Sequence, residues 1–92
     1  MPSPPLDPPV ADGAPQAVTL TKYDRQHLVT YLRLLDAEHK GEDWRTVARV
    51  VLHLDPGNNL ERARRAWETH LARAHWMIDN GHRDLMQEDP PL

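Results

Sequence analysis

Residues that disfavour helix, glycine, proline and asparagine, occur at two places in this chain and divide its apolar residues into stretches that have helical spacing. The first break is at Gly41 and the second is Pro56–Asn59, while Gly81 follows the last long stretch. Within each stretch, apolar side chains recur every three or four residues, as in a helix that buries one face. The sequence therefore predicts an all-α fold, a small domain of three main helices plus a short C-terminal helix.

The first helix is expected to run from about residue 21 to residue 40. Thr21 is a good N-cap, and Asp24 falls in the first turn, where carboxylates are favourable. The predicted main apolar stripe consists of Leu28, Tyr31, Leu32 and Leu35. A second, short helix should begin after Asp43 and bury Trp44, Val47, Ala48 and Val51.

The third helix is expected to be the longest, from Asn59 as its N-cap to Asn80. Its predicted buried side consists of Leu60, Ala63, Trp67, Leu71, Ala74 and Ile78. A final turn or helix over residues 82–87 should fold Leu85 and Met86 back onto it.

The two ends of the chain differ in composition from its middle. Residues 1–19 hold six of the nine prolines, which disfavour helix and supply few backbone donors, so they are expected to form a disordered tail. The predicted helical domain spans residues 20–87, and residues 88–92 form a second disordered tail.

Composition argues against catalysis and for a single domain in the cytoplasm. The 92 residues permit one domain, and the absence of Cys excludes disulfides, thiolate zinc sites and cysteine nucleophiles. Ser3 is the only serine, no phosphate loop is present, and His70 and His75 do not share a helix face. No signal peptide or membrane span is expected. We therefore expect no enzyme activity, no metal, no cofactor and no small-molecule substrate.

The order of short helix, turn and arginine-containing helix is that of a helix-turn-helix with an extended turn. If this unit reads DNA, the residues entering the groove would be Asn58, Arg62, Arg65 and Thr69. The alternative is a solvated polar face. The charge balance favours that alternative, because residues 20–87 hold all eleven Lys and Arg residues but also ten acids, so this part is about neutral and the acidic tails give the whole chain a net charge of −3. We therefore expect weak or absent DNA binding.

Two sets of residues are candidates for a protein-binding surface. Tyr23, His27, Tyr31 and Leu34 fall together beside the main stripe of the first helix, where they form either a second, partner-binding face or part of the core. Trp76 falls on the predicted outer side of the third helix. It is either covered by another part of the chain or exposed as an anchor for a protein partner.

Three segments together resemble the family called domain of unknown function 2285: residues 31–36 (YLRLLD), 44–48 (WRTVA) and 79–86 (DNGHRDLM). The resemblance spans about residues 23–87. It implies a helix-turn-helix-like module of proteobacterial regulators, many of them encoded on conjugative elements. Some members are transcriptional activators with an additional N-terminal domain, and short stand-alone members are antiactivators within quorum-sensing circuits.

Charge balance and resemblance together favour an antiactivator. The hypothesis is that the chain binds a transcriptional activator, at that protein's N-terminal partner domain, and prevents activation of conjugative-transfer genes. The alternative hypothesis is a DNA-binding helix-turn-helix transcriptional regulator. The two differ in whether the exposed arginines form one face that acids leave uninterrupted.

Overall fold

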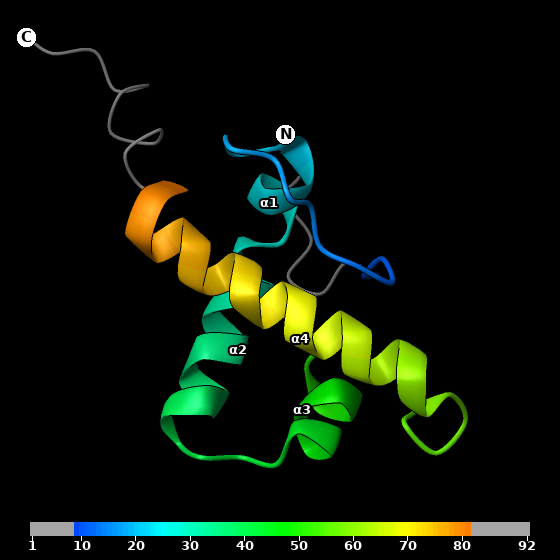
Figure 1. Ribbon diagram of the computed structural model, residues 1–92. Coiled ribbons are helices and arrows are strands. Elements are labelled where there is room, and N and C mark those ends of the chain that lie inside the picture. The colour runs from blue at the N-terminus through cyan, green and yellow to red at the C-terminus, as the bar shows by residue number, and fades with distance from the viewer. Residues whose placement is uncertain (1–8, 82–92) are drawn as a thin grey trace, which may run out of the picture.

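The computed structural model describes residues 9–81, and it confirms the all-α fold. Its elements are α1 (Lys22–Gln26), α2 (Leu28–His39), α3 (Trp44–Val50), α4 (Leu60–Trp76) and the π-helical turn η1 (Met77–Gly81). Helix α4 crosses the whole molecule and packs on both α2 and α3 (Figure 1). None of the helices in residues 9–81 is both long and apolar enough to cross a membrane.

The predicted first helix is divided in two at His27. Thr21 and Asp24 form a capping box that begins α1 as expected. His27 then leaves helical geometry with φ −112° and ψ 21°. Its backbone N–H and its ring Nδ1 both lie within 3.0 Å of the Tyr23 carbonyl oxygen, so the imidazole closes α1 before α2 begins.

The buried face of α2 overlaps the predicted stripe only in part. Tyr31 and Leu34 are buried against α4, whereas Leu32 is 60% exposed. Leu28 and Leu35 are only partly buried. At 100° per residue, the buried face is rotated by about 100° from the predicted one. The rotation arises because the buried face also includes polar residues, Thr30 and His27, which an apolar stripe does not count.

Helix α3 and the turn after it agree with the sequence prediction. The Asp43 carboxylate caps α3 by accepting from the Arg45 backbone N–H at 3.1 Å. After α3, His53 adopts a left-handed conformation with φ 58°, and the Asp55 carbonyl then accepts from the N–H groups of Asn58 and Asn59. Asn59 caps α4 through the Arg62 N–H at 3.1 Å. The connection between α3 and α4 is therefore an ordered, extended turn.

Helix α4 buries Ala63, Leu71 and Ala74 as predicted, but its buried side is rotated from the predicted one. Its buried residues are Ala63, Ala66, His70, Leu71, Arg73 and Ala74. Leu60 and Ile78, both expected in the core, are exposed. This buried side is centred roughly 50° away from Trp67, which is only partly buried.

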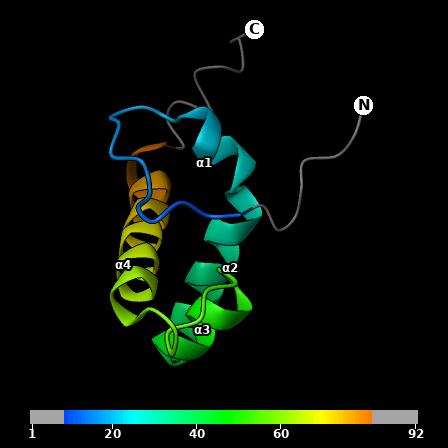
Figure 2. The same ribbon diagram turned by 90° about the vertical axis from the view of Figure 1, so that its right-hand side faces the viewer.

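Residues 9–19, which we call the N-terminal strap, were expected to be disordered but pack on the helices. The strap crosses from the α1–α2 junction to α4 and then returns to α1 (Figure 2). Proline rules out helix here but leaves carbonyl oxygens free to accept hydrogen bonds, and those of Pro9, Ala17 and Thr19 do so. Residues 1–8, the predicted helix over 82–87 and the tail over 88–92 lie outside the described residues.

Candidate nucleic-acid interface

The α3–turn–α4 unit carries five exposed arginines. Arg45 and Arg49 lie on α3, and Arg62, Arg64 and Arg65 lie in the first two turns of α4. The turn therefore brings guanidinium groups from two helices to one end of the molecule. Charged fork-shaped donors at the start of a long helix suit the recognition of phosphate and of base edges.

An open groove with a volume of about 580 Å³ lies between α3 and α4. Three arginines and two glutamates contribute to it, so positive and negative side chains are mixed along its length. The residues that line it are Trp44, Arg45, Leu60, Glu61, Arg64, Arg65 and Glu68.

Two tryptophans hold two of the three arginines of this groove, Arg45 and Arg64, in place. The rings of Trp44 and Trp67 pack with their centroids 5.9 Å apart. The Arg64 guanidinium carbon lies 4.9 Å from both ring centroids, and the Arg45 guanidinium carbon lies 5.0 Å from Trp44. Arg64 also pairs with Glu68 at 2.5 Å. These cation–π contacts give the α3–α4 junction fixed positive groups at its surface.

The four predicted DNA contacts do not share one environment. Arg65 is exposed and lines both the groove and a hollow of about 200 Å³ beside it. Arg62 lines the same hollow, where its Nε lies 2.6 Å from the Asp12 carboxylate of the strap. Thr69 is half-buried and accepts from the Ala14 N–H at 3.1 Å. Asn58 is exposed in the turn before α4.

The four predicted protein contacts on the first helix lie inside the fold. Tyr31, Leu34 and His27 are buried, with exposed fractions of 0%, 1% and 3%. Tyr23 is half-buried, and its hydroxyl lies 2.5 Å from His70 Nε2 on α4. The burial of Tyr31, Leu34 and His27 corresponds to the core alternative, whereas Tyr23 keeps part of its surface exposed. Trp76 is partly buried against the core, with the Arg73 guanidinium carbon 3.8 Å from its ring centroid.

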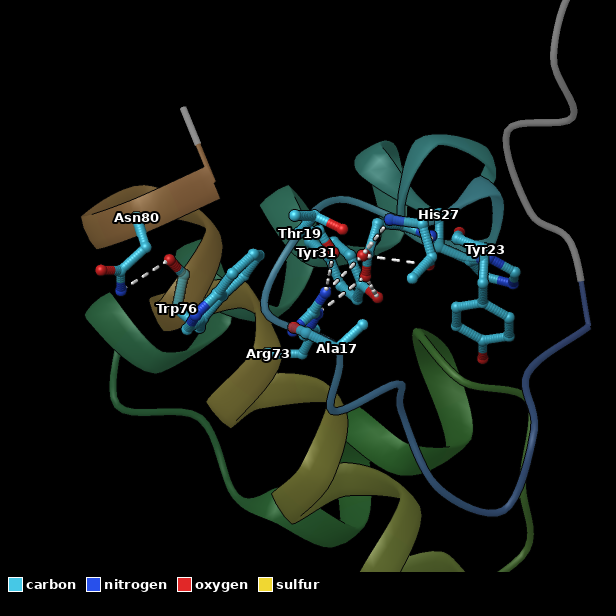
Figure 3. A network of polar contacts seen from close by, with 10 residues as sticks. Ala17, Thr19, Tyr23, His27, Tyr31, Arg73, Trp76 and Asn80 are labelled. Atoms are coloured by element: carbon cyan, nitrogen blue, oxygen red, sulfur yellow. Dashed lines mark hydrogen bonds and ion pairs between the residues drawn. The ribbon is translucent and has the colours of Figure 1, made fainter. Parts of the chain in front are cut away.

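A buried ion pair, which the sequence analysis did not predict, joins α1, α4 and the strap. Arg73 Nε and Nη2 donate to the two oxygens of Asp24 at 3.0 and 2.7 Å. Arg73 also donates to the carbonyls of Ala17 and Thr19, and Tyr31 donates to Asp24 at 2.7 Å (Figure 3). Burial raises the pKa of Asp24, but hydrogen bonds from Arg73, Thr21 and Tyr31 outweigh it and lower that pKa to about 2. Asp24 is therefore ionised at neutral pH.

A second network of hydrogen bonds fixes the tautomer of the buried histidine His70. His70 Nδ1 lies 2.7 Å from the Ala66 carbonyl, so Nδ1 carries the proton and Nε2 accepts from the Tyr23 hydroxyl. The Tyr23 oxygen in turn accepts from the Ala11 N–H at 2.9 Å. Burial lowers the pKa of His70 and raises that of Tyr23, so both groups are neutral at pH 7. His27 stacks on Tyr23 with ring centroids 3.8 Å apart.

The hydrogen bonds of both networks are made within the fold. Hydrogen-bond partners satisfy every buried side-chain nitrogen and oxygen in the described part of the chain. Within residues 9–81, no cluster of three or more His, Asp or Glu residues could hold a metal ion. Hydrophobic periodicity does not mark Asp24, His70 or Arg73 as buried, because Asp24 and Arg73 lie 49 positions apart, with α2 and α3 between them.

A comparison of the sequence with protein families identifies the family of this chain. Residues 7–87 match the model of the RovC DNA-binding domain family, which is described as a T6SS transcription factor, DNA binding domain. The chain belongs to this family. The match includes the whole strap, over residues 9–19, and both helices of the α3–α4 unit. A search of curated proteins found no match.

Membership of a RovC-type DNA-binding family supports the coarser part of the sequence interpretation, a helical module of transcription regulators. The match gives no support to the finer resemblance to domain of unknown function 2285, nor to antiactivation, quorum sensing or conjugative elements.

Proposed function

We propose that this chain is a DNA-binding domain of a transcription regulator. The match of residues 7–87 to a family of transcription-factor DNA-binding domains carries the proposal. The geometry is consistent with it, since the α3–turn–α4 unit has helix-turn-helix order and carries exposed arginines on both helices. The role is binding rather than catalysis.

In this proposal the N-terminal half of α4 enters the major groove. Arg65 enters the DNA major groove and is the main residue that contacts base edges, because it is exposed near the centre of the outer side of α4. Arg45 and Arg49 on α3 contact the phosphate backbone and set the orientation of the domain. Arg64 acts by position, since Trp44, Trp67 and Glu68 hold its guanidinium.

The acids on α4 restrict which contacts can form. Glu61 and Glu68 line the same groove as Arg64 and Arg65, and they repel phosphate. Binding through this face therefore depends on a few well-placed arginines rather than on a continuous basic patch. We expect modest non-specific affinity and a small number of phosphate contacts.

The test is a fluorescence-anisotropy titration with duplex DNA from the chain's own promoter region at about 50 and 200 mM salt, over which phosphate-dependent binding weakens markedly. Arg65→Ala should weaken sequence-specific binding by about tenfold or more. Arg25→Ala is the matched control, since it removes one exposed arginine from α1, at the other end of the molecule (Figure 1). Equal effects of the two substitutions, or no saturable binding at low salt, would contradict the proposal.

Antiactivation remains the second candidate because of one open hollow between the strap and the C-terminal half of α4. Val18 of the strap, which is 88% exposed, and the partly buried Trp76 both line it. If the chain binds an activator, the isolated N-terminal domain of that activator should bind saturably and Trp76→Ala should abolish the complex. Binding to DNA without binding to that domain would leave the first proposal alone.

A further inference from the structure

The strap contacts two of the four residues that would read DNA. The Asp12 carboxylate lies 2.6 Å from Arg62 Nε, and the Ala14 N–H donates to Thr69 Oγ1 at 3.1 Å. Both contacts join residues at least 50 positions apart in the sequence. One edge of the outer side of α4 is therefore covered by the chain itself.

The strap is held firmly on each side of these contacts. Before them, the Pro9 carbonyl lies 2.9 Å from His27 Nε2, and the Ala11 N–H donates to Tyr23. After them, the carbonyls of Ala17 and Thr19 accept from the buried Arg73 guanidinium at 2.6 and 3.0 Å. These anchors lie on elements of the core, so they keep the middle of the strap next to α4.

The middle of the strap is exposed. The side chains of Asp12 and Arg62 are 64% and 49% exposed, and a Cβ added at the neighbouring Gly13 would meet nothing within 4 Å. An exposed ion pair of this kind is weak and is screened by salt. The pair can therefore separate while the anchors at both ends remain in place.

Asp12 occupies a position that suits a phosphate group. It lies in the hollow formed with Asn59, Glu61, Arg62 and Arg65, at the N-terminal end of the 17-residue helix α4. Two guanidinium groups and the positive end of the helix dipole attract an anion there and outnumber the one opposing carboxylate, that of Glu61. The carboxylate of Asp12 satisfies one of those guanidinium groups in the free protein.

We propose that Asp12 is an autoinhibitory group, which competes with a DNA phosphate for Arg62. The inference rests on the proposed DNA-binding function. DNA that binds along α4 displaces the carboxylate, so Arg62 exchanges an internal anion for an external one. The strap thereby lowers the affinity for DNA. It also makes the salt dependence of binding shallower by about one ion pair.

The test compares the DNA affinities of Asp12→Asn and Asp36→Asn, using duplex DNA from the promoter region of the gene that encodes this chain. Asp36 is a matched control because it also forms an exposed ion pair, with Lys40 at 3.0 Å on α2, and its removal changes the net charge equally. Asp12→Asn should tighten DNA binding by about fivefold at low salt and steepen the plot of log K against log salt by about one unit. Asp36→Asn should change the affinity by less than about twofold.

A double variant locates the effect on Arg62. Arg62→Ala added to Asp12→Asn should return the affinity to about the wild-type value, which a general charge effect would not do. Equal gains from Asp12→Asn and Asp36→Asn, or a gain that survives Arg62→Ala, would overturn the inference and leave the proposed function standing. No DNA binding by the wild type or by any variant would overturn the proposed function, and the inference with it.

Discussion

Replacing Asp24 by asparagine should leave the buried Arg73 guanidinium without its charged partner. The carboxylate accepts two hydrogen bonds from Arg73, and the two side chains are 0% and 4% exposed. Asparagine keeps the shape and one acceptor but removes the charge that balances Arg73. Removing one partner of a buried ion pair costs about 3–5 kcal/mol.

The pKa of Asp24 gives an independent measure of the same interaction. Its fall from 3.8 to about 2 corresponds to about 2–3 kcal/mol of stability for the ionised form. Because the pKa is lower in the folded state, this stability is present above the unfolded-state pKa and is lost as pH falls from about 4 through 2. For a domain that is stable by about 5–14 kcal/mol, either figure is a large fraction of the total.

Urea denaturation followed by far-UV circular dichroism measures both effects. At pH 7, Asp24→Asn should lower the free energy of unfolding by about 3 kcal/mol, whereas the exposed control Asp36→Asn should lower it by less than about 1 kcal/mol. Between pH 4 and pH 2 the wild type should lose about 2 kcal/mol more than Asp24→Asn. A loss below about 1 kcal/mol for Asp24→Asn at pH 7 would refute the reasoning.

Three further predictions test the core. Leu34→Ala should cost about 2–5 kcal/mol in urea denaturation, whereas Leu32→Ala should change stability by no more than about 0.5 kcal/mol; the reverse order would restore the stripe predicted from sequence. Tyr23→Phe removes the donor to His70 Nε2, so it should lower the free energy of unfolding by about 1–3 kcal/mol, and an unchanged midpoint would exclude the hydrogen bond. Because burial lowers the pKa of His70, the unfolded state binds more protons than the folded state near pH 6. The contribution of His70 to stability should therefore fall as pH drops from 7 to 5. The variant His70→Gln should lack that pH-dependent contribution in the same titration.

Local signals in the sequence predicted where helices begin and end. Thr21, Asp43 and Asn59 were each expected to cap a helix, and each accepts a backbone hydrogen bond at that position. Gly41 has φ +71°, as a residue that ends a helix commonly does. These features were predictable because they depend only on a residue and its near neighbours.

The faces of the helices were harder to predict because burial depends on partners far along the chain. Apolar periodicity placed Leu32 inside and left Arg73 and His70 unassigned, whereas the structure buries the last two through hydrogen bonds with Asp24 and Tyr23. A polar residue becomes a core residue only when its partner is brought to it, and one sequence does not show that pairing.

The charge count favoured antiactivation, whereas the family match supports the alternative of a DNA-binding regulator, and a related physical reason limits what a charge count can show. Asp24 and Arg73 cancel inside the core, Asp36 pairs with Lys40, and Asp12 lies beside Arg62. A total over the chain counts all of these charges equally, although only exposed groups at the α3–α4 end act on a ligand there. The net charge therefore carried little information about DNA binding.

The placement of the tryptophans gives the chain its own optical reporters. Trp44 and Trp67 lie at the α3–α4 junction, each with the Arg64 guanidinium over its ring, and Trp76 lies beside the strap under Arg73. Indole emission responds to nearby charge and to water. Variants that keep a single indole would therefore show which end of α4 a bound molecule approaches, with no added dye.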